Sequence, residues 1–98
     1  MEFIFEYQNV SASERLENLA KEKLHRLQTK FSFVHRADIF FKTENRSDNN
    51  GMVCTIRLSM PGPRLAAETK ASNFESAISE TVRDLNRQLA KREETMQN

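Results

Sequence analysis

The order of two apolar periodicities along the chain constrains its fold more than any other feature. Four segments alternate their side chains with a period of two, which is typical of β-strands: residues 2–8, 37–44, 52–60 and 64–70. Two further segments, residues 12–30 and 73–92, place apolar side chains three or four positions apart, which is typical of amphipathic helices. The sequence therefore predicts the element order β-α-β-β-β-α.

Both predicted helices begin at a capping-box pattern, Ser11-Ala-Ser-Glu14 for the first and Ser72-Asn-Phe-Glu75 for the second. In this pattern the serine and glutamate side chains satisfy free backbone N–H groups of the first helical turn. Pro61-Gly62-Pro63 predicts a turn between the last two strands. The polar residues 44–51 predict a longer hairpin connection.

One apolar stripe on each helix and one apolar face on each strand predict an α+β fold. In this fold both helices pack on one side of a four-stranded sheet. Ile39, Phe41 and Cys54 would then face the helices. On the opposite face, Phe40 and Val53 would lie among charged side chains.

The length of 98 residues suits one domain. We expect this domain to span residues 1–92, and residues 93–98 to form a flexible polar tail. The first residues, MEFIFEYQ, lack the basic start of a secretory signal. No apolar run approaches the roughly 20 residues that a membrane helix needs. We therefore expect a cytoplasmic protein that has no membrane partner.

The sequence lacks the residue patterns on which enzymes and metal sites depend. His25 and His35 have no partner at ligand spacing, so we expect no metal site. Cys54, the single cysteine, falls on the inward face of its strand, and no basic group is placed to make it a thiolate. The acidic residues are scattered, and no glycine-rich phosphate loop occurs. We predict no catalytic residues, no cofactor and no small-molecule substrate.

Basic side chains gather on one flank of the helix predicted over residues 12–30. Four of them fall within about 80° of one another, beside the apolar stripe: Arg15, Lys23, Arg26 and Lys30. Glu14 and Glu17 lie on the other flank, but Glu22 borders the basic one, so the segregation by sign is partial. The net charge of the chain is only +1, so this segregation matters more than the total charge for binding a polyanion.

The second predicted helix carries Arg83, Arg87 and Lys91 at intervals of four residues. Glu80 and Asp84 fall in or beside the same sector, so the row fits a solvated face with i,i+3 ion pairs. The row also fits a surface on which cations neutralise phosphates and release counterions. Two basic faces on neighbouring helices favour phosphate binding more than either face alone.

Several local motifs resemble those of a known family. They are Arg87-Gln88-Leu89-x-Lys91, Lys23-Leu24-x-Arg26-Leu27 followed by Phe31, and Ala77-Ile78 with Leu85 further on. With the order of elements, these motifs make essentially the whole chain similar to the short ribosome hibernation-promoting factors and ribosome-associated translation inhibitors of bacteria.

This resemblance implies a fold similar to double-stranded RNA-binding domains, and binding to ribosomal RNA in the decoding channel of the small ribosomal subunit. There the protein would block tRNA and mRNA binding and inhibit translation under stress. The match by position assigns RNA contact to Lys23, Arg26, Arg87 and Lys91, and helical geometry alone adds Lys30, Arg83 and Arg92.

The chain departs from the family pattern in its second helix. Asn73 and Glu75 stand where the family often has Asp and Tyr, and Ser79 replaces a later Asp. Asp84 aligns with a family lysine, although Arg83 beside it supplies a cation. We therefore expect the basic patch to be shifted around this helix.

The leading hypothesis is a non-enzymatic ribosome hibernation factor that is monomeric away from the ribosome. One alternative is a general module for structured RNA. Another is a protein-interaction or dimerisation domain that uses the outer sheet face around Phe40. An exposed aromatic side chain on a sheet can also stack on an RNA base, so the role of Phe40 stays open at this point.

Overall fold

A computed structural model describes the backbone of residues 1–96 and the side chains of residues 1–94. Its elements, in chain order, are β1 (Glu2–Gln8), α1 (Glu14–Lys30), β2 (Arg36–Thr43), β3 (Met52–Ser59), β4 (Leu65–Ala71) and α2 (Phe74–Met96). The predicted order β-α-β-β-β-α is therefore confirmed, and each strand lies within one residue of its predicted bounds.

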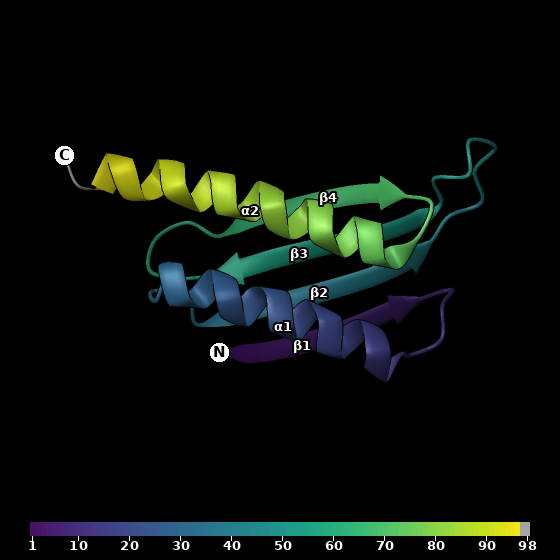
Figure 1. Cartoon of the computed structure of the whole chain (residues 1–98), viewed down its shortest axis with the longest axis horizontal. Helices are drawn as coiled ribbons and strands as arrows, with labels where there is room; N and C mark the ends of the chain where they lie inside the picture. The colour runs from purple at the N-terminus through teal and green to yellow at the C-terminus, as the bar shows by residue number, and fades with distance from the viewer. Residues whose placement is uncertain (97–98) are drawn as a thin grey trace.

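The four strands form one sheet in the order β1-β2-β3-β4. β1 pairs with β2 in parallel, and the two hairpins β2–β3 and β3–β4 are antiparallel. Both helices cover the same face of this sheet, with α1 in front of β1 and β2 and α2 in front of β3 and β4 (Figure 1). The predicted two-layer α+β architecture is thus confirmed.

The start of α1 differs from the predicted capping box. The N-cap is Ser13 rather than Ser11, and its hydroxyl accepts a hydrogen bond from the Leu16 backbone N–H at 3.3 Å. The Tyr7 hydroxyl of β1 accepts from the Ser13 N–H at 3.3 Å and donates to the Glu17 carboxylate at 2.6 Å. Tyr7 thus takes the place of the box glutamate, and this contact from a neighbouring strand makes the helix begin later.

The second helix also differs at both ends. Its first turn is capped by Asn73, whose side-chain oxygen accepts from the Ser76 N–H at 2.7 Å, and not by Ser72 as predicted. The helix continues to Met96, beyond the predicted end at Arg92, because no glycine or proline stops it there. Gln97 and Asn98 lie outside the described residues, and the flexibility expected for residues 93–98 stays a prediction.

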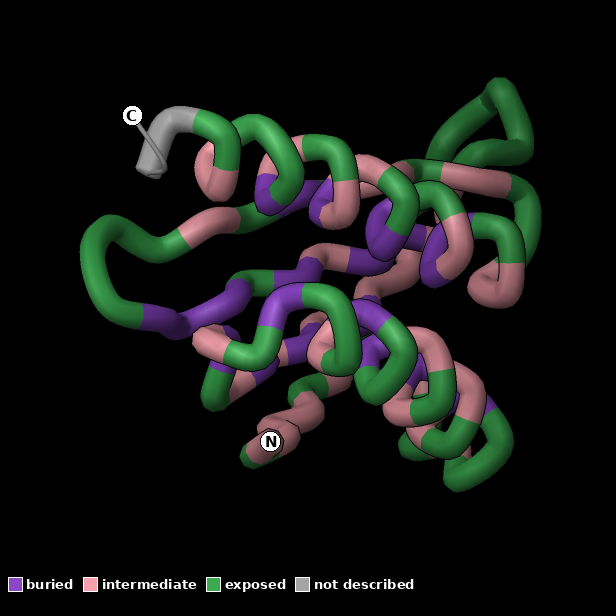
Figure 2. The backbone as a smooth tube through the Cα atoms, turned by 60° about the vertical axis from the view of Figure 1, so that its left-hand side comes forward, coloured by how far each residue is buried: buried purple, intermediate pink, exposed green. Residues whose placement is uncertain are grey.

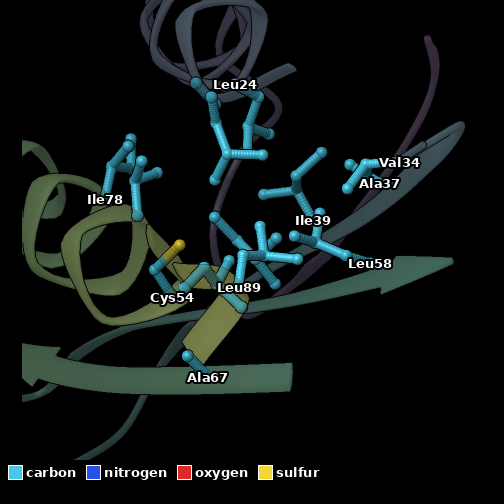
Figure 3. Packing of buried hydrophobic residues seen from close by; sticks show 14 of the residues in the cluster. Leu24, Val34, Ala37, Ile39, Cys54, Leu58, Ala67, Ile78 and Leu89 are labelled. Atoms are coloured by element: carbon cyan, nitrogen blue, oxygen red, sulfur yellow. The ribbon is translucent and has the colours of Figure 1, made fainter. Parts of the chain in front are cut away.

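The core lies between the sheet and the two helices. The sides of α1 and α2 that face the sheet are buried, whereas their opposite sides are exposed (Figure 2). Leu24 of α1 and Ile78 of α2 point toward Ile39 and Leu58 of the sheet (Figure 3), and all four side chains are 1% exposed or less. This shared apolar layer fixes the two helices side by side.

Val53 points outward as predicted, but it is fully buried rather than surrounded by solvent. Its strand neighbours on this face are Lys42 and Lys70. Both ammonium groups reach the Glu44 carboxylate, at 3.0 Å and 3.3 Å respectively. The side chains bound to this common anion flank Val53, which explains how an outward valine loses its contact with water.

One buried hydroxyl links α2 to the sheet through polar contacts. Thr81 is 0% exposed, and its Oγ lies 2.7 Å from the Ala77 carbonyl oxygen and 3.3 Å from the Cys54 carbonyl oxygen. The Thr69 hydroxyl is 2.9 Å away, so both hydroxyls are satisfied. Removing the Thr81 hydroxyl would take a hydrogen-bond partner from the Thr69 hydroxyl and from the Cys54 carbonyl oxygen.

We predict that Thr81→Val lowers the free energy of unfolding by about 1–3 kcal/mol, because the substitution keeps the shape but leaves the Thr69 hydroxyl and the Cys54 carbonyl oxygen without this partner. Urea denaturation followed by circular dichroism measures the change. Thr29→Val is the matched control, since Thr29 is exposed on α1. Equal stability of the two variants would contradict this role for Thr81.

Candidate nucleic-acid interface

A groove with a volume of about 410 Å³ lies between α1 and α2. We call it the helix groove. Each helix contributes residues at positions i, i+3, i+4 and i+7, which place four side chains on one stripe. The groove is lined by Lys23, Arg26, Leu27 and Lys30 from α1 and by Ser79, Val82, Arg83 and Asn86 from α2.

The groove owes its form to side chains that sit next to the buried stripe of each helix. Leu27 and Val82 belong to the core and form the apolar part of the lining. The cationic residues lie close to them on the same helical turns, where their methylene stems can rest on apolar surface while the charged heads reach water. Arg26, Lys30 and Arg83 are exposed, and Lys23 is half-buried.

The charged side chains that line the helix groove are all positive. Its lining includes four cations and, within the described residues, no carboxylate. Arg26 pairs with Glu22 at 2.8 Å and Arg83 with Glu80 at 3.6 Å, but both pairs are exposed. Exposed ion pairs contribute little free energy, so these guanidinium groups can exchange their carboxylates for phosphates.

Neither Lys23 nor Lys30 forms an ion pair with any described residue. Their charges are therefore not cancelled within the part of the chain that the structure describes. Together with the two arginines, they make the helix groove a concentrated positive surface on a chain whose net charge is only +1.

The structure brings together four of the seven predicted RNA-binding residues, namely Lys23, Arg26, Lys30 and Arg83. Arg87 lies one turn beyond Arg83, outside the groove lining, and its guanidinium is 3.6 Å from the Asp84 carboxylate. Lys91 is exposed a further turn along. Arg92 does not line the groove, and its guanidinium donates to the Pro63 carbonyl oxygen at 2.6 Å.

Two polar groove residues, Ser79 and Asn86, were not predicted from the sequence. Asn86 donates from its side-chain amide to the Val82 carbonyl oxygen at 3.0 Å. Both residues belong to the same helical stripe as Arg83, so their spacing from Arg83 could have revealed them. A pattern of cations alone does not include them, although hydroxyl and amide groups also bind phosphates.

Cys54, possible metal ligands and possible membrane helices were also considered among the described residues. Cys54 is 0% exposed, and burial raises the pKa of its thiol to about 12, which confirms the predicted buried thiol. Residues 1–94 contain no group of three His, Cys, Asp or Glu side chains that could hold a metal ion. No helix in the described part of the chain is long and apolar enough to cross a membrane.

Residues 3–97 match the model of one protein family, described as Sigma 54 modulation protein / S30EA ribosomal protein. A search of curated protein sequences finds no match to the chain.

Solved structures also resemble this fold. A ribosomal subunit interface protein from Coxiella burnetii superposes with a TM-score of 0.84 at 22% sequence identity, covering 95% of this chain and 98% of that one. The N-terminal domain of Protein Y from Thermus thermophilus gives a TM-score of 0.79 at 17% identity, covering 93% of this chain and 98% of that domain. At these identities the likeness establishes the fold.

We predict that Cys54 in the folded protein reacts with Ellman's reagent only as fast as the protein opens. Its raised pKa keeps the thiolate scarce, and burial excludes the reagent. The labelling rate should therefore stay far below that of the urea-unfolded chain from pH 7 to pH 9. Rapid labelling of the native protein that rises with pH like a free thiol would contradict this assignment.

Proposed function

The chain belongs to the Sigma 54 modulation protein / S30EA ribosomal protein family, and we propose that it is a ribosome hibernation factor. In this proposal it binds ribosomal RNA in the decoding channel of the small subunit. It thereby blocks tRNA and mRNA binding and inhibits translation under stress.

The helix groove is the observation that carries this proposal. Four cations line it on two neighbouring helices that a common core holds side by side. Lys and Arg side chains neutralise phosphates and release condensed counterions, which supplies most of the sequence-independent affinity for nucleic acid. Structured RNA is recognised mainly through its shape, its phosphates and its 2′-hydroxyl groups, and side chains on rigid helices suit that mode.

The name of one of the two similar proteins agrees with this proposal. One is a ribosomal subunit interface protein, and the other is the N-terminal domain of Protein Y. For this chain we propose the small subunit as the partner, with the helix groove turned toward ribosomal RNA. Arg87 and Lys91, one and two turns beyond Arg83, would extend the contact along the exposed side of α2.

The proposed mechanism is steric and reversible. The protein would inhibit translation by filling the path of tRNA and mRNA, so it needs no covalent chemistry. Exposed ion pairs such as Arg26 with Glu22 would open, and the guanidinium groups would bind phosphates instead. One chain holds the entire groove, so the proposal requires only a monomer.

A general module for structured RNA is the second candidate function. The helix groove favours it too, because its cations contact phosphates without reading bases. Competition between ribosomes and free duplex RNA for the labelled protein separates the two functions. Preference for the small subunit supports the hibernation factor, and equal preference supports the general module.

We predict that Lys30→Glu with Arg83→Glu abolishes co-sedimentation with small ribosomal subunits, with affinity falling at least about a hundredfold, because the change replaces attraction to phosphates with repulsion. The circular dichroism spectrum should stay unchanged, since both side chains are exposed.

Lys21→Glu with Arg46→Glu is the matched control for net charge. Lys21 lies on α1 over the rings of Phe3 and Phe5, and Arg46 lies in the β2–β3 loop, so both are outside the helix groove. This control should still co-sediment with small subunits. Equal losses in the two variants would show that overall charge, and not the groove, governs binding.

A further inference from the structure

The face of the sheet turned away from the helices has a hollow of about 400 Å³. We call it the outer hollow. Its volume is in the range of small-ligand pockets. Apolar, acidic and basic side chains meet in its lining, among them Ile4, Glu6, Phe40, Thr55, Arg57 and Arg64.

The strand register explains how these side chains meet. On the outer face Phe40 of β2 lies between Glu6 of β1 and Thr55 of β3. Arg57 is next along β3 on the same face, and Arg64 immediately precedes β4. The aromatic ring therefore has a carboxylate on its β1 side and two guanidinium groups on its β3–β4 side.

Phe40 is set apart from the other aromatic residues of the sheet. Phe3, Phe5, Tyr7 and Phe41 are buried in the core or packed against it, whereas Phe40 is half-buried in the lining of the outer hollow. Ile4, on the neighbouring strand, adds apolar surface beside it. The hollow thus offers one aromatic face on which a planar ring can stack.

Three of the charged side chains that line the hollow have no ion-pair partner among the described residues. Arg36 and Asp38, which also line the hollow, pair with each other at 2.9 Å, and elsewhere on this face Lys42 and Lys70 lie within 3.3 Å of the Glu44 carboxylate. In contrast, Arg57 and Arg64 form no ion pair with any residue that the structure describes, and neither does Glu6. Two free guanidinium groups can hold a phosphate, and a free carboxylate can accept from paired N–H donors.

We infer that the outer hollow binds a guanine nucleotide. The base stacks on Phe40, the Glu6 carboxylate accepts hydrogen bonds from the N–H groups of the guanine edge, and Arg57 and Arg64 hold the 5′-phosphate. The distance from β1 to β3 spans two strand spacings, about 10 Å, which is comparable to the distance from the edge of the base to the phosphate.

Balanced charge distinguishes this site from the helix groove. The outer hollow mixes Glu6 and Asp38 with its arginines, whereas the groove lining has no carboxylate in the described residues. A polyanionic duplex is therefore better suited to the helix groove, and a single nucleotide, with one charged end and one polar edge, is better suited to the outer hollow. The inference does not depend on the proposed ribosomal function.

The test is a titration of ¹⁵N-labelled protein with GMP, AMP, guanosine and a single-stranded hexaribonucleotide of guanosine and uridine. We expect GMP to shift the amide resonances of β1, β2 and β3 and to bind more tightly than AMP or guanosine. A hexamer that binds more tightly than GMP identifies an RNA strand as the source of the nucleotide. Equal or weaker binding of the hexamer identifies free nucleotide.

Three variants assign the contacts. Phe40→Leu keeps the apolar volume but removes the stacking ring, and it should weaken GMP binding about tenfold. Arg57→Gln should weaken GMP binding and leave guanosine binding unchanged, because guanosine has no phosphate. Glu6→Gln should remove the preference for GMP over AMP, because it removes the acceptor for the guanine edge.

Two control variants distinguish the outer hollow from the rest of the charged surface. Arg46→Gln, in the exposed β2–β3 loop, should bind GMP like the wild type. Lys30→Glu with Arg83→Glu should also bind GMP normally, so failure of the ribosomal proposal would leave this result intact.

The inference is overturned if millimolar GMP shifts no resonances, or shifts only those of the helix groove. It is also overturned if Phe40→Leu and Arg57→Gln bind GMP like the wild type. Shifts of the same strand residues that depend on protein concentration without nucleotide would identify the face as a dimer contact, and would overturn it as well.

Discussion

The apolar layer between the sheet and the two helices determines everything else in this fold. Leu24 on α1 and Ile78 on α2 are fully buried against the same sheet, so each helix has only one rotation in which its stripe is covered. That rotation decides which side chains line the space between the helices. The cations of the helix groove are adjacent to the buried stripes, and they converge because the stripes converge.

The two faces of the molecule differ in how their charges are arranged. The helix groove gathers four cations without a lining carboxylate in the described residues. The outer face instead interleaves acids and bases, and it uses Glu44 to join Lys42 and Lys70 beside the buried Val53. A net charge of +1 therefore does not show that one surface is strongly positive, and this separation of charge is the physical basis for proposing that duplex RNA binds on the helix side.

The order of elements, the common helical layer and all four groove cations could be predicted from the sequence, because all of these follow from periodicity. Local sequence patterns gave wrong predictions where a contact with a residue distant in the sequence determines the conformation or burial of a side chain. The N-cap of α1 is Ser13 and not Ser11, because the Tyr7 hydroxyl of β1 bonds to Ser13 and Glu17. Val53 is buried because side chains from the two neighbouring strands flank it. The Arg92 guanidinium donates to the carbonyl oxygen of Pro63, which lies in a loop about thirty residues earlier. Helical geometry alone cannot predict this contact.

The salt dependence of binding to small ribosomal subunits tests the central claim most directly. If the four groove cations each neutralise a phosphate, replacing Lys23, Arg26, Lys30 and Arg83 with glutamine should make the slope of log K against log salt shallower by about 3. The four matching substitutions outside the helix groove, at Lys21, Lys42, Arg46 and Lys70, should leave the slope nearly unchanged. The same slope for the groove variant and the wild type would contradict the assignment of the RNA contact to the groove.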